Sequence, residues 1–196
     1  LFKLIKSILD SNKSIKNITT DNLNFPSDKY ICELVAKDFN IDFNFLNYGS
    51  DLIADIEKLK EFITKKRGII VLSHVAFKSS YRYPIEEISK FCNDNNTVVI
   101  WDLSHSIGAV DIDMGLNQVN YAVGCTYKYL NGGPGSPAFI YVSGQELRKL
   151  KSPIRGWFSH EKPFEYSDEY NESNSIEKFS NGTPHILSLS TLKTSL

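Results

Sequence analysis

Two short runs of consecutive apolar residues place the strongest constraint on the fold of this chain. The runs are IIVL at residues 69–72 and VVIW at residues 98–101, and a stretch with helical apolar spacing lies between them at residues 84–93. A strand that is apolar at every position is typical of a parallel sheet covered by helices on both faces. The order strand, helix, strand predicts a right-handed crossover between parallel neighbours. We therefore expect an α/β domain with a mostly parallel sheet.

The rest of the chain extends this alternation. Apolar residues recur at helical spacing near the start of the chain and after Ser27 and Ser50, and both serines are expected to act as N-caps. Pro84 is expected to begin the helix over residues 84–93. Further strands are predicted at residues 42–47, 121–123 and 138–142. The predicted fold class is a three-layer α/β/α sandwich. We expect residues 1–150 to form its core and residues 151–196, where periodicity fades, to be an irregular connection.

Composition and charge exclude several classes of function. Hydrophobic residues make up 41% and charged residues 23% of the 196 residues, as in globular proteins rather than disordered ones. The net charge of −1 provides no basic surplus for binding nucleic acid. No apolar run approaches the roughly 20 residues that cross a bilayer, so no membrane partner is expected. Three cysteines without CxxC spacing argue against a zinc site or a disulfide framework, so we expect no metal and a reducing, cytoplasmic location.

Asp102 is the first candidate functional residue, because it directly follows the apolar run at residues 98–101. Ligands of α/β proteins bind outside the carboxyl ends of the strands. An aspartate in that place has two interpretations. It can cap the next turn, or it can hold a cationic ring nitrogen in its protonated state. The residue pattern alone leaves both open, and His105 follows three residues later.

Lys128 is the second candidate, in the segment CTYKYLNGGPGS at residues 125–136. It follows a predicted strand and precedes a turn rich in glycine, so we expect it in a crevice. Most lysines are solvated surface residues. The alternative is a lysine that forms a Schiff base, which must be partly neutral near pH 7. Tyr127 beside it is suited to act as an acid or a hydrogen-bond donor.

Taken together, these motifs resemble the kynureninases. These are enzymes of the aspartate aminotransferase fold (fold type I) that depend on pyridoxal 5′-phosphate (PLP). The resemblance covers essentially the whole chain. The segments that carry it are WDLSHSIGAV at 101–110, GCTYKYLNGGPGS at 124–136, FPSD at 25–28, LSHV at 72–75, GWF at 156–158 and, more weakly, GTP at 182–184.

The resemblance implies a role for each residue around the cofactor ring. Lys128 would bind PLP covalently, Asp102 would pair with the ring nitrogen, and His105 would lie beside the ring. Phe25 would stack on the face of the ring. The same wall would be completed by Pro26, Ser27 and Asp28. The residues expected to carry the catalysis are Lys128, Tyr127 and Asp102.

The resemblance also implies how the cofactor phosphate is held. Ser73 and Tyr127 would help to hold the cofactor, Tyr127 through the phosphate. Trp157 and Thr183 match positions that bind the phosphate of the neighbouring subunit, so a homodimer is implied.

The activity implied is hydrolysis of L-kynurenine to anthranilate and L-alanine, or of 3-hydroxykynurenine to 3-hydroxyanthranilate, in tryptophan catabolism and NAD biosynthesis. Because the family is about twice as long, this chain is expected to be the large-domain core, without a preceding Leu-Thr phosphate turn and a following small domain. Two alternatives stand beside this hypothesis. One is another fold-type-I PLP enzyme, such as a cysteine desulfurase or an aminotransferase. The other is an inactive module that binds no PLP.

Overall fold

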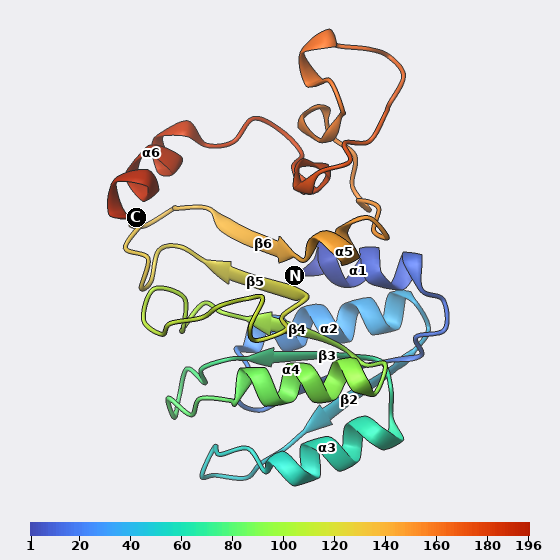
Figure 1. The fold of residues 1–196 in the computed structure, drawn as a ribbon, viewed down its shortest axis with the longest axis vertical. Coiled ribbons are helices and arrows are strands. Elements are labelled where there is room, and N and C mark those ends of the chain that lie inside the picture. The colour runs from blue at the N-terminus through green and yellow to red at the C-terminus, as the bar shows by residue number, and fades with distance from the viewer.

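The computed structural model describes residues 1–196 and contains a single six-stranded sheet of order β2-β1-β3-β4-β5-β6 (Figure 1). Strands β1 to β5 are parallel, and β6 runs antiparallel to β5. The mostly parallel sheet is thus confirmed. The strands are β1 (Asn17–Asp21), β2 (Asp42–Leu46), β3 (Ile69–Ser73), β4 (Val98–Asp102), β5 (Tyr121–Cys125) and β6 (Ala138–Val142).

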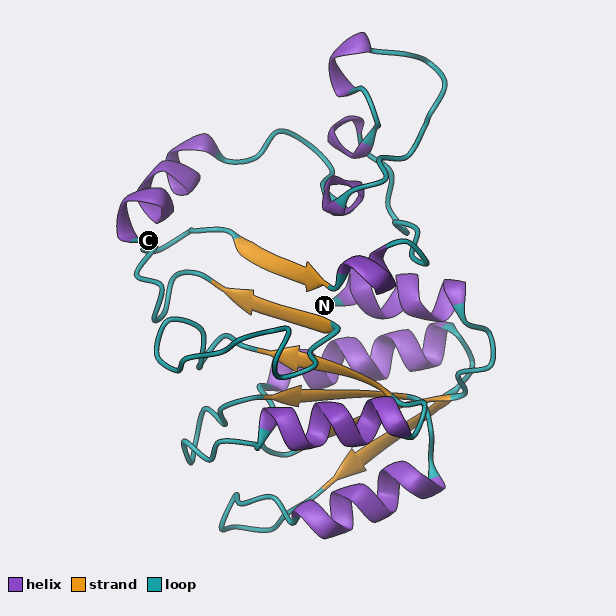
Figure 2. Cartoon of the chain, viewed as in Figure 1, coloured by secondary structure: helices purple, strands orange, loops and turns teal.

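Helices cover both faces of the sheet (Figure 2). One apolar core joins α1 and α2 to the sheet face that carries Val71, and the other joins α3 and α4 to the face that carries Leu72. Successive side chains of β3 thus point into different cores, which explains why this strand is apolar at every position. The helices are α1 (Phe2–Ser11), α2 (Pro26–Asp38), α3 (Ile56–Lys65), α4 (Ile85–Asp94), α5 (Gly144–Leu147) and α6 (Ile186–Ser195).

Strand β1 was not predicted, although it lies inside the sheet between β2 and β3. Its sequence, NITTD, contains a single apolar residue, yet all five residues are buried. The Thr20 hydroxyl donates a hydrogen bond to the Val71 carbonyl at 2.9 Å, so its polarity is satisfied within the sheet. An interior strand can therefore be polar in sequence when its side chains bond to neighbouring strands.

Two helix starts differ from the prediction. Ser27 is not a cap, because α2 begins at Pro26, with Phe25 as the N-cap. Ser50 is not a cap either. Asp55 precedes α3, and its carboxylate accepts a hydrogen bond from the Lys58 amide at 3.0 Å. A carboxylate is a better acceptor for the free amides of a first turn than a hydroxyl.

The chain beyond β6 leaves the sheet and returns to it (Figure 1). After α5 it forms three 3₁₀ turns, Trp157–Ser159, Pro163–Glu165 and Ile176–Phe179, and then α6, a helix that the sequence pattern did not indicate. The Ser195 hydroxyl of α6 donates to the Leu130 carbonyl at 2.8 Å, next to Lys128. No helix combines the length and apolar character needed to span a membrane.

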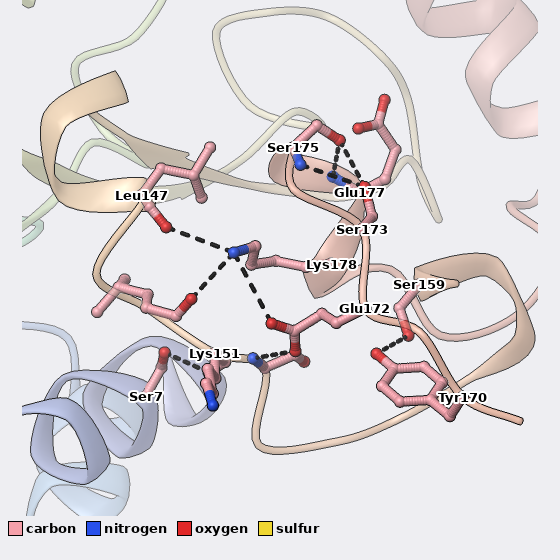
Figure 3. Close-up of polar contacts among 12 residues, drawn as sticks. Ser7, Leu147, Lys151, Ser159, Tyr170, Glu172, Ser173, Ser175, Glu177 and Lys178 are labelled. Carbon is pink, nitrogen blue, oxygen red and sulfur yellow. Dashed lines mark hydrogen bonds and ion pairs between the residues drawn. The ribbon is translucent and has the colours of Figure 1, made fainter. Parts of the chain in front are cut away.

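A buried lysine anchors this excursion (Figure 3). Lys178 is 5% exposed, and its ammonium donates to the Leu150 carbonyl at 3.0 Å. Its second partner is Glu172, whose Oε2 lies 3.8 Å from Nζ. The other carboxylate oxygen of Glu172 accepts from the Ser152 amide at 2.8 Å. The start and the end of the irregular segment are therefore held together by one satisfied buried charge.

Candidate active site

A cavity of about 860 Å³ opens beside the carboxyl ends of β4 and β5. This is the size of a cofactor or small-molecule site, at the edge of the sheet where α/β proteins bind ligands. Residues of α2, of β4 and of the turn after β5 meet there, although they are far apart in the sequence. The predicted site residues that line it are Phe25, Ser27, Asp28, Asp102, Tyr127 and Lys128.

Asp102 is the last residue of β4 and is 6% exposed. Its Oδ1 accepts a hydrogen bond from the Ser104 amide at 2.9 Å, which caps the turn after the strand. The Ser73 hydroxyl lies 3.4 Å from Oδ2. The capping interpretation is confirmed, and the role toward a ring nitrogen stays a prediction. One oxygen caps the turn, and the second is available to a ligand of the cavity.

Lys128 lies in the turn after β5, with its Nζ 5.5 Å from the centre of the Phe25 ring and 5.4 Å from that of Tyr127. The turn packs closely against the loop after β4. A Cβ atom on Gly108 would lie 2.6 Å from the Tyr129 carbonyl oxygen, and Gly108 has a φ of +84°. Only glycine permits this approach. The two motifs that carry Asp102 and Lys128 are thus brought together by a glycine contact.

An aromatic row forms one wall of the site. Phe77 meets the ring of Phe25 edge-on at 5.0 Å and lies 6.4 Å from His105. His105 does not line the cavity itself. Burial, and next the charge of Lys128, lower the pKa of His105, so its imidazole is neutral at pH 7. Phe77 was missed by sequence reasoning, although it lies in the segment that continues the LSHV motif.

Two carboxylates share the cavity, and this changes the ionisation of Asp28. Burial, and next the negative charge of Asp102, raise the pKa of Asp28 to about 7, while the amino group of Leu1 and then Lys128 oppose the rise. Oδ2 of Asp28, which lines the cavity, is buried without a hydrogen-bond partner in the chain. Buried polar atoms are normally bonded, so such atoms indicate a polar ligand. A planar heteroaromatic ring that bears polar substituents and an aldehyde fits the aromatic side chains, the unpaired carboxylate oxygen and the Lys128 amine of this cavity.

The structure places the other predicted residues outside the cavity. Ser73 is 2% exposed, and its hydroxyl donates to Oδ1 of Asn24 at 2.5 Å, behind Asp102. Pro26 is exposed in the first turn of α2. Trp157 and Thr183 lie on the excursion with exposed side chains. The chain does not bring these two to Lys128, and the expectation for them concerned a neighbouring subunit.

Several residues around the cavity had no signal in the sequence. Ile154, Ile176 and Phe179 reach its rim from the irregular segment. They carry neither a motif nor a periodicity, and only the path of the chain brings them there. No group of three or more His, Cys, Asp or Glu side chains is arranged to hold a metal ion.

Comparisons with known proteins confirm the resemblance. The kynureninase of Pseudomonas fluorescens is 36% identical over 200 residues, which cover 100% of this chain and 47% of that protein. The kynureninase of Burkholderia pseudomallei is 33% identical with the same coverage. The chain thus spans about half the length of the curated relatives it matches.

Solved structures confirm the fold. A cysteine desulfurase from Thermococcus onnurineus NA1 matches with a TM-score of 0.75 and 18% identity, covering 92% of this chain and 44% of that one. A lysine-to-alanine mutant of C-DES, with glycine covalently linked to the PLP cofactor, matches with a TM-score of 0.76 and 19% identity, covering 92% and 48%. At this identity the likeness concerns the fold alone.

The family model that describes aminotransferase class-V matches residues 2–196. This match agrees with the sheet topology and with the cavity at the carboxyl ends of β4 and β5. The chain therefore belongs to the aminotransferase class-V family, PLP-dependent enzymes of fold type I.

Proposed function

We propose that this chain is the cofactor-binding part of a kynureninase, which hydrolyses L-kynurenine to anthranilate and L-alanine, or 3-hydroxykynurenine to 3-hydroxyanthranilate. The observation that carries the proposal is that Lys128 and Asp102 line one cavity beside the Phe25 ring. The chain also aligns along its whole length with curated kynureninases.

The proposed roles are those that the family resemblance implies, and the positions of the side chains around the cavity support them. Lys128 would hold PLP covalently through Nζ, and Oδ2 of Asp102 would face the ring nitrogen. Phe25, supported by the edge of Phe77, would pack against the ring. Tyr127, which is half exposed at the cavity, would contact the phosphate. Bound PLP supplies an electron sink for a carbanion formed at the substrate.

The protein groups then move protons at defined atoms. Asp102 keeps the ring nitrogen protonated, because a buried carboxylate stabilises a cation beside it. When Nζ of Lys128 is not bonded to the cofactor, it would remove the proton from the substrate α-carbon. After water has added to the γ-carbonyl of the substrate and the Cβ–Cγ bond has broken to release anthranilate, the Tyr127 hydroxyl would donate a proton to the alanyl β-carbon. Asp28, with a pKa of about 7, exchanges a proton near neutral pH.

A homodimer and a cytoplasmic location complete the proposal. Trp157 is 41% exposed and packs with Phe164 and Tyr166, which are more exposed still. In a dimer this aromatic group and Thr183 would reach the phosphate of the second subunit. All three cysteines are free, as in a reducing compartment.

A second candidate is another PLP enzyme of this fold, because the family match and the shared fold fit it as well. The full-length protein with PLP decides between them. Wild type is expected to show a cofactor absorbance that Lys128→Ala abolishes and Lys37→Ala, on the exposed side of α2, leaves unchanged.

Anthranilate fluorescence from added kynurenine supports the proposal. Sulfide from added cysteine without anthranilate supports the desulfurase. A folded protein that binds no PLP supports the inactive module, and an unchanged chromophore in Lys128→Ala refutes the site.

A further inference from the structure

Asn24, which no motif singled out, connects three parts of the site. It lies between β1 and α2 and is 5% exposed. Its Oδ1 accepts from the Phe25 amide at 3.0 Å and from the Ser73 hydroxyl at 2.5 Å. Its Nδ2 donates to the Thr20 hydroxyl at 2.9 Å and to the Val71 carbonyl at 3.1 Å. All four hydrogen-bonding positions of the amide are therefore occupied.

The orientation of this amide is fixed by backbone groups. The Phe25 amide can only donate, and the Val71 carbonyl can only accept, so Oδ1 must face Phe25 and Nδ2 must face Val71. The Ser73 hydroxyl therefore meets an acceptor. It has to place its one proton on the bond to Asn24.

The direction of the Ser73 proton determines which hydrogen bonds the Asp102 carboxylate accepts. The Ser73 oxygen lies 3.4 Å from Oδ2 of Asp102, but its proton points to Asn24 at 2.5 Å. Oδ1 of Asp102 already accepts from the Ser104 amide. Oδ2 thus keeps its lone pairs for the ligand. A second hydrogen bond from Ser73 would spread the carboxylate charge and weaken its bond to a cationic ring nitrogen.

We propose that Asn24 is a positioning residue that sets the acceptor strength of Asp102 by taking the only hydroxyl proton of Ser73. The effect on the ring nitrogen rests on the proposed function, whereas the direction of the Ser73 hydroxyl does not. In Asn24→Leu, Ser73 is free to turn and donate to Asp102. In the double variant with Ser73→Ala there is no proton to donate.

The first experiment needs no cofactor. Crystal structures of the cofactor-free full-length protein are expected to show the distance from Ser73 Oγ to Asp102 Oδ2 shortening from 3.4 Å in the wild type to about 2.7 Å in Asn24→Leu. An unchanged distance overturns the proposal, whether or not the protein binds PLP.

The second experiment measures the NMR chemical shift of the ring nitrogen in PLP labelled with ¹⁵N. Asn24→Leu is expected to move its NMR shift toward that of neutral pyridine and to weaken PLP binding about tenfold. Ser73→Ala alone and the double variant are expected to keep the wild-type shift.

The matched control is Asn22→Leu, in the same turn, whose amide donates to Asn47 and Gly49 away from the cavity. A merely structural role for Asn24 predicts that the double variant keeps the shifted signal, and this result overturns the proposal. If Asn24→Leu does not fold, Ser73→Ala still decides. A signal moved away from neutral pyridine in Ser73→Ala would show that Ser73 donates to Asp102 in the wild type, and this would overturn the proposal.

Discussion

Asp28 provides a test of the electrostatics of the cavity that requires no substrate. Its pKa rises from 3.8 to about 7, mainly through burial and next through Asp102. Because the folded-state pKa lies above the unfolded one, the folded chain binds the proton more tightly between these values. Stability therefore falls as the pH rises from about 4 to about 7 and is constant above that range. Replacing Asp28 by asparagine removes this loss.

The magnitude follows from the same numbers. Each pKa unit corresponds to about 1.4 kcal/mol, so a rise of about three units sets a ceiling of about 4 kcal/mol. Asp28 is only partly shielded from solvent, and screening reduces the effect to about 2 kcal/mol. Asp28→Asn is expected to match the wild type near pH 4 and to be about 2 kcal/mol more stable at pH 7.5.

Urea unfolding of the cofactor-free full-length protein at several pH values measures the difference. Glu33→Gln removes an exposed carboxylate from the same helix and is expected to change stability by a small, pH-independent amount. Burial also raises the pKa of Asp21, to about 6. Its effect on the pH dependence of unfolding is the same in wild type and variant, so it cancels in the difference between them. An Asp28→Asn advantage that is the same at pH 4.5 and 7.5 would refute the reasoning.

Three further changes test other contacts. Asp102→Asn keeps the cap on the Ser104 amide, so the free energy of unfolding is expected to change by less than about 1 kcal/mol. The same variant is expected to bind PLP more than tenfold more weakly, as measured by absorbance titration. Gly108→Ala forces a Cβ against the Tyr129 carbonyl at a positive φ, and thermal unfolding is expected to show a loss of more than about 1 kcal/mol. Lys178→Met leaves half-buried Glu172 without its cation and the Leu150 carbonyl without its donor, which is expected to cost about 2 kcal/mol in urea unfolding and to speed proteolysis within residues 152–177. Equal cleavage rates in wild type and variant would contradict the anchoring role of this lysine.

The sequence predicts those parts of the fold whose burial is apolar. Strands β3 and β4 are buried between two helical layers, so their hydrophobic runs indicate them directly. Strand β1 is buried just as deeply, but its polarity is satisfied by bonds such as that from Thr20 to Val71, which no local pattern reveals. The antiparallel direction of β6 is likewise a property of pairing, not of composition.

The candidate site likewise contains residues that the sequence predicts and residues that it does not. Asp102 and Lys128 are found by their positions after strands, because strand ends of a parallel sheet converge. Asn24 and Phe77 have no such signal, because their importance arises from contacts with distant residues. Asn24 bonds to Ser73, 49 positions away, and Phe77 packs against Phe25, 52 positions away. Long-range contacts of this kind require coordinates.

The reversed direction of β6 also determines how long the following segment must be. Val142, the last residue of β6, pairs with Tyr121, the first residue of β5, so the polypeptide finishes the sheet at the end remote from Lys128. Lys178 is still held at that end by the Leu150 carbonyl, so the residues after it have to travel back along the sheet to bring Ser195 beside Leu130. Residues 179–185, which join this anchored point to α6, are therefore a connection of required span, and shortening them would withdraw Ser195 from the turn that carries Lys128.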